Sequence, residues 1–74
     1  MDAAAAPAIL VSLNGERRRL PAGSTVAGLL AELGLDRRKV AVERNEAIVM
    51  RSAYAETALA EGDQLEIVHF IGGG

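Results

Sequence analysis

Five short runs of this chain are predicted as strands, from alternating hydrophobic and polar residues or from the turn residues beside them, and in one other run hydrophobic residues recur every three to four positions. Alternation places apolar side chains on one face of a strand, whereas the longer repeat places them on one face of a helix. The runs predicted as strands are residues 8–13, 16–20, 40–44, 47–50 and 64–71. The predicted order is therefore two strands, a helix and three further strands.

Turn and cap residues separate these runs. Asn14-Gly15 is the strongest short signal for a hairpin, so the first two strands are predicted to pair antiparallel. Ser24 and Thr25 supply N-cap oxygens in front of the helix, and Gly34 is a C-terminal stop signal. The buried face of this helix is predicted to consist of Val26, Leu29, Leu30 and Leu33.

Residues 51–60 show no clear period and are predicted to form a loop with a helical turn, from which Tyr54 and Leu59 fold inward. The packing of a sheet on a helix and right-handed crossovers allow the first and last strands to lie side by side in parallel at the centre of the sheet, and that arrangement gives a β-grasp roll. The predicted fold class is α+β, a β-grasp (ubiquitin-like) roll with a mixed sheet of four to five strands on one helix. Its predicted core is Ile9, Val11, Leu29, Leu30, Leu33, Leu65 and Ile67.

The 74 residues suffice for one small domain. We divide them into a flexible leader (1–8), the β-grasp domain (9–71) and a flexible glycine tail (72–74). Glycine has no Cβ, so such a tail enters channels that other residues would block, and it reaches about 10 Å beyond the last strand. Terminal glycines alone more often mark only a frayed end. Next to the tail, strand alternation turns Val68 and Phe70 away from the predicted core.

Charge and composition exclude several function classes. Eight Lys and Arg against ten Asp and Glu give a net charge of −2, which lacks the broad positive field of nucleic-acid binding proteins. The chain has no cysteine and one histidine, His69, so no metal site is predicted, and His69 is expected to be a partly buried strand residue. Residues 1–7 resemble neither a signal peptide nor a membrane span, which favours a cytoplasmic protein without membrane contact.

Three motifs together resemble the ThiS family of sulfur carrier proteins for thiamine biosynthesis, over residues 9–74. The motifs are the Gly23-Ser24-Thr25-Val26 helix start, the Glu61-Gly62-Asp63 turn and the ending Val68-His69-Phe70-Ile71-Gly72-Gly73-Gly74. The ending is the most specific of the three, because the family requires a diglycine at the C-terminus.

The resemblance implies a carrier and not an enzyme, with no bound cofactor. An ATP-dependent partner similar to ubiquitin-activating enzymes adenylates the carboxylate of Gly74. Sulfur, supplied from cysteine by way of a desulfurase, then replaces AMP to give a C-terminal thiocarboxylate, and thiazole synthase takes that sulfur. The tail predicted to enter the partner's active site is Gly72, Gly73 and Gly74. Beside it, the outward apolar residues Val68 and Phe70, together with Ile71, are predicted to bind the partner.

Three other functions fit the same architecture. The small subunit of molybdopterin synthase also resembles this chain in its terminal diglycine and thiocarboxylate chemistry. A ubiquitin-like modifier would instead attach Gly74 to lysines of other proteins. A plain interaction module with an inert tail would keep every partner after removal of that tail.

Overall fold

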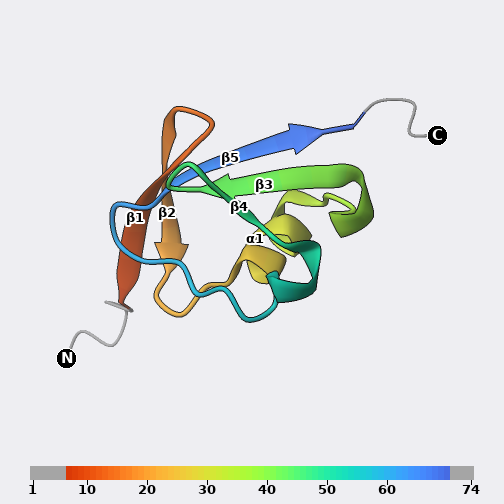
Figure 1. Ribbon diagram of the computed structural model, residues 1–74. Coiled ribbons are helices and arrows are strands. Elements are labelled where there is room, and N and C mark those ends of the chain that lie inside the picture. Colours follow the sequence, from red (N-terminus) through yellow and green to blue (C-terminus); the bar gives the residue numbers. More distant parts are fainter. Residues whose placement is uncertain (1–6, 71–74) are drawn as a thin grey trace.

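The computed structural model describes residues 7–70 and shows a five-stranded sheet with one helix packed against it (Figure 1). The elements are β1 (Ala8–Leu13), β2 (Glu16–Pro21), α1 (Val26–Leu33), η1 (Arg37–Lys39), β3 (Val40–Arg44), β4 (Ala47–Val49), η2 (Arg51–Ala53) and β5 (Gln64–His69). The strand order is β2-β1-β5-β3-β4. β1 and β5 run parallel, and the other neighbouring strands run antiparallel. The β-grasp prediction is thereby confirmed.

Local sequence signals fix the first hairpin and the helix. Asn14 and Gly15 have φ angles of 50° and 87°, so β1 and β2 pair from Leu13↔Glu16 outward. At the start of α1, the backbone N–H of Gly28 donates to the Thr25 Oγ1 at 3.1 Å. Gly34 ends the helix with a φ of 74°, a conformation that glycine adopts without steric cost.

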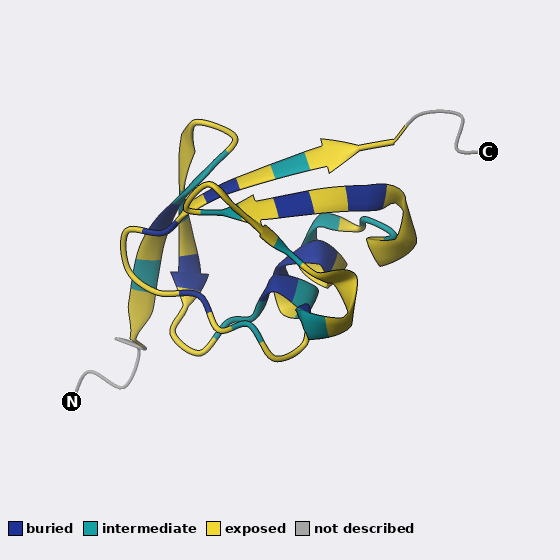
Figure 2. Cartoon of the chain, viewed as in Figure 1, coloured by how far each residue is buried: buried dark blue, intermediate teal, exposed yellow. Residues whose placement is uncertain are grey.

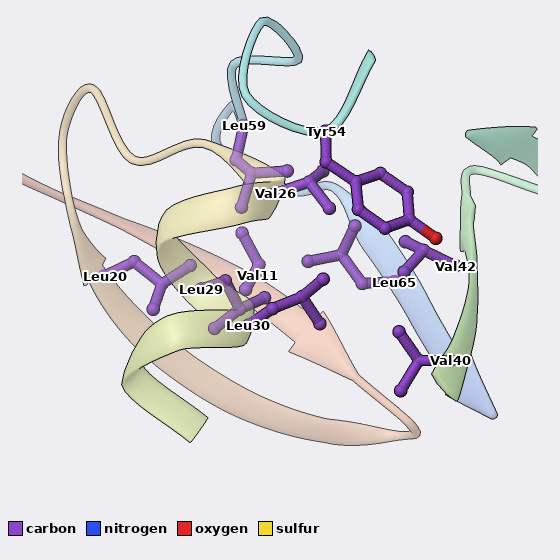
Figure 3. Close-up of a cluster of buried hydrophobic side chains, with 10 residues drawn as sticks. All are labelled: Val11, Leu20, Val26, Leu29, Leu30, Val40, Val42, Tyr54, Leu59 and Leu65. Carbon is purple, nitrogen blue, oxygen red and sulfur yellow. The ribbon is translucent and has the colours of Figure 1, made fainter. Parts of the chain in front are cut away.

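The core lies between the sheet and α1, and Figure 3 shows its ten buried side chains. They are Val11, Leu20, Val26, Leu29, Leu30, Val40, Val42, Tyr54, Leu59 and Leu65. Figure 2 shows the alternation of buried and exposed residues along β3 that the sequence pattern predicts. Tyr54 and Leu59 are 2% and 5% exposed, which confirms that this loop folds two anchors inward.

The predicted core was wrong in part. Ile9, Leu33 and Ile67 are only partly buried and pack around the edge of the cluster. The predicted list also omitted Val40 and Val42, which β3 turns fully inward. Alternation identifies which residues share a face, but burial also depends on what covers that face.

Element boundaries differ from the predictions at three places. β5 ends at His69 and not at Ile71, which lies outside the described residues. β4 ends at Val49, because the chain turns into η2 after Met50. β2 ends at Pro21, one residue beyond the predicted run of 16–20. β1 spans Ala8–Leu13 as predicted, so Ala8 belongs to the strand and not to the leader.

Replacement of Leu30 by alanine should lower the free energy of unfolding by about 2–5 kcal/mol, because the side chain is 2% exposed and its removal leaves a cavity. Leu10→Ala is the matched control, since Leu10 is 38% exposed. Urea unfolding of both variants tests the core assignment. Equal losses for the two variants would contradict it.

Candidate functional site

The candidate site is the end of β5, from which the chain continues toward the glycine tail (Figure 1). β5 lies between β1 and β3. It pairs with β3 from Arg44↔Leu65 to Val40↔His69, but its register with β1 comprises only Ser12↔Gln64 and Leu13↔Leu65. The second half of β5 therefore extends past the end of β1.

Asn14 continues the sheet at the point where β1 stops. Its backbone N–H donates to the carbonyl oxygen of Leu65 at 2.8 Å. Its side chain then bonds the next residue along the same edge of β5: the N–H of Ile67 donates to Asn14 Oδ1 at 2.8 Å, and Asn14 Nδ2 donates to the Ile67 carbonyl at 3.2 Å. The amide thus occupies the place of a further β1 residue.

Asn45 makes the equivalent contacts at the other edge of β5. Its backbone N–H donates to the Gln64 carbonyl at 2.7 Å, and the N–H of Gln64 donates to Asn45 Oδ1 at 2.9 Å. Both asparagines have a φ near 50°, a left-handed conformation that asparagine tolerates better than most residues. Two hairpin turns therefore hold the central strand from opposite sides.

Asp63, the residue immediately before β5, is held in place by hydrogen bonds to its carboxylate. Its carboxylate is buried and accepts hydrogen bonds from Asn45 Nδ2 at 3.0 Å, the Ala60 N–H at 2.8 Å and Arg44 Nε at 2.9 Å. Burial acts to raise the pKa of Asp63, but these three donors outweigh it and hold the pKa below its ordinary value. Asp63 is therefore an ionised and fully bonded anchor at neutral pH.

Val68 and Phe70 are 59% and 45% exposed, which confirms their predicted outward position. Their role in partner binding stays a prediction. The other predicted site residues, Ile71, Gly72, Gly73 and Gly74, lie outside the described residues.

The sequence did not reveal two large apolar residues that are exposed at the β4 edge of the sheet. They are Ile48 in β4, with an exposed fraction of 74%, and Met50 just after β4, with 68%. The register places Ile48 beside Glu43, which faces Glu66 of β5, and places Ala41 beside Val68. The outer face of the sheet thus combines apolar side chains with carboxylates. Residues 47–50 are all apolar, so no alternation with polar residues marked which of them face outward.

His69 is exposed, so its predicted partial burial was wrong. It is the last residue of β5 and stands opposite Val40, whose side chain fills the core at this position. In the alternation along β5, His69 lies on the same face as the buried Leu65, but at the end of the strand this face is open to solvent.

Residues 7–70 contain no group of three or more His, Cys, Asp or Glu side chains that could hold a metal ion. Within the same range, no helix has the length and apolar character needed to cross a membrane.

Comparison with known proteins shows one consistent family. The model of the ThiS family matches residues 11–74. A protein named sulfur carrier protein ThiS from Bacillus subtilis is 46% identical over 50 residues, which cover 68% of this chain and 76% of that protein. The crystal structure of the thiamine biosynthesis protein ThiS from Geobacter metallireducens superimposes with a TM-score of 0.76 at 29% identity, over 89% of this chain and 100% of that one.

Much longer proteins also contain a similar segment. A thiazole synthase from Paramagnetospirillum magneticum is 61% identical over 62 residues, which cover 84% of this chain but 19% of that protein. A thiazole synthase from Magnetococcus marinus shows 55% identity over 64 residues, or 20% of its length. The chain therefore spans about a fifth of the length of these two relatives.

Proposed function

Because the chain belongs to the ThiS family, we propose that it is a sulfur carrier of thiamine biosynthesis whose C-terminal glycine carries the sulfur. The observation that carries this proposal is the extent of the family match, which begins in β1 and runs through Gly74. The match therefore includes the glycine tail together with the domain that positions it.

The proposed chemistry begins at the carboxylate of Gly74. A carboxylate is a poor electrophile, so an adenylating enzyme similar to ubiquitin-activating enzymes first joins it to AMP and releases pyrophosphate from ATP. A desulfurase takes sulfur from cysteine as a persulfide, and a second thiol reduces the persulfide to release hydrosulfide and form a disulfide. Hydrosulfide then attacks the acyl carbon and expels AMP. The product is a thiocarboxylate that thiazole synthase uses as its sulfur donor.

The geometry of β5 supports this role. β5 is bonded to β3 along one edge and to β1 and Asn14 along the other, so the strand leaves the sheet in a fixed direction. We propose that residues 72–74 enter a partner's active site as extended backbone. A carrier of this kind supplies the reacting group, and its partners supply the catalysis.

We propose Val68, Phe70 and Ile71 as the docking residues beside the tail. Val68 and Phe70 lie on the outer face of the sheet directly before it, and exposed aromatic residues are common anchors in protein interfaces. The first partner is the adenylating enzyme and the second is thiazole synthase. The two longer relatives named thiazole synthase support the second pairing, because each contains a segment similar to this chain.

The carrier proposal predicts a change of mass. Incubation with ATP, the adenylating enzyme and hydrosulfide should raise the intact mass by the difference between sulfur and oxygen. Peptide mapping should place that gain on Gly74, and the variant that lacks Gly74 should show none. A carrier that keeps its original mass with a demonstrably active enzyme would defeat the proposal, whereas attachment to lysines of other proteins would identify a modifier.

Phe70→Ala should weaken binding to thiazole synthase by about tenfold or more, because truncation of an aromatic anchor typically has this effect. Leu10→Ala is the matched control, since Leu10 is also exposed but precedes the β1 residues that pair with β5. Calorimetric titration measures both affinities. Equal affinity of the Phe70 and Leu10 variants would show that the docking residues lie elsewhere.

A further inference from the structure

The end of β5 has one edge that no other described strand covers. Past Leu65, the register with β1 has ended, and Asn14 bonds to this edge only as far as Ile67. Figure 1 shows β5 continuing away from β1. On the opposite edge, pairing with β3 continues to His69, and the N–H of Phe70 donates to the Lys39 carbonyl at 2.8 Å. The strand end is thus bonded on one side only within residues 7–70.

The two-residue repeat of a β-strand shows in which direction the backbone N–H and C=O of His69 point. Ile67 directs its N–H and C=O to Asn14, on the β1 side. Backbone groups two residues apart in a strand point the same way. The N–H and C=O of His69 therefore point to the β1 side as well, beyond the reach of the hairpin contacts described above.

The other two edges of the sheet carry features that discourage pairing with another chain. β2 bears three consecutive arginines, at residues 17–19, and ends at Pro21. β4 has only three residues. Charge, proline and short length are the common means by which proteins protect strand edges. Residues 68–70 are Val-His-Phe, so this edge carries no arginine, lysine, carboxylate or proline.

From this edge we infer that β5 accepts one further strand, an extended segment of thiazole synthase, beside residues 67–70. The inference rests on the proposed function, because that partner must already receive the adjoining tail. Strand addition supplies backbone hydrogen bonds, and side chains of alternate residues supply specificity. On the outer face, the added strand would lie next to Val68 and Phe70, so apolar side chains fit there.

The first test is site-resolved amide hydrogen exchange of the wild-type protein, free and bound to the thiazole synthase of the same genome. The inference predicts that exchange at His69 slows by about tenfold or more on binding, as expected for a newly formed hydrogen bond. Exchange at Ile67, which is already bonded to Asn14, should change much less. Unchanged exchange at His69 within the complex would overturn the inference.

The second test removes the donor. His69→Pro deletes the N–H that faces the open edge and keeps the pairing with β3, a position at which strands accept proline. Its affinity for thiazole synthase should fall by about tenfold relative to His69→Ala, which removes the same side chain but keeps the N–H. An unchanged melting temperature shows that the proline variant folds. Equal affinities of the two variants would contradict strand addition.

The mass experiment separates this inference from the proposed function. A protein that gains sulfur on Gly74 but shows no protection at His69 overturns the added strand and leaves the carrier function standing. Protection at His69 in a protein that gains no sulfur supports the added strand and overturns the carrier function.

Discussion

The structure depends on how its central strand satisfies backbone hydrogen bonds on two edges of unequal length. β3 accompanies β5 to its end, whereas the pairing of β1 with β5 stops at Leu65. The hydrogen bonds at this point are exposed, so water could satisfy the backbone groups, and a bond within the protein adds about 0.5–1.5 kcal/mol of stability. The side chain of Asn14 supplies such bonds to Ile67, 53 residues away in sequence.

The side-chain hydrogen bonds along β5 also bear on the proposed function. Asn45 and Asp63 hold the beginning of β5, and Asn14 holds its middle. Within the part of the chain that the structure describes, the end of the strand has one bonded edge and exposed side chains at Val68 and Phe70. For the proposed carrier function, this difference in bonding along β5 would hold the start of the strand in place and leave the surface beside residues 68–70 open to a partner.

The sequence predicted the fold well because its signals are local. Asn14-Gly15 formed the first hairpin, and Thr25 and Gly34 marked the ends of α1. Hydrophobic periodicity helped to locate the helix and the strands along the chain. These features involve residues within one turn of each other, so no knowledge of the tertiary structure is needed.

Other features could not be predicted, because they arise between distant segments. The bonds from Asn14 and Asn45 to β5 require the tertiary register, and the pattern that identifies a turn does not reveal a second role for its side chain. The exposure of His69 depends on its position at the end of the sheet. Within the candidate site, alternation predicted the outward position of Val68 and Phe70, whereas the exposed Ile48 and Met50 emerged only from the structure.

The side chain of Asn14 holds β5 where β1 has ended, and amide hydrogen exchange at Ile67 reports on this contact. In Asn14→Gly, which keeps the left-handed turn, Ile67 should exchange about tenfold faster than in the wild type at equal global stability. The amide of Gln64, bonded to Asn45, should keep its rate, and Asn14→Asp should retain most of the protection through Oδ1. Equal exchange at Ile67 in the wild type and the glycine variant would contradict the account.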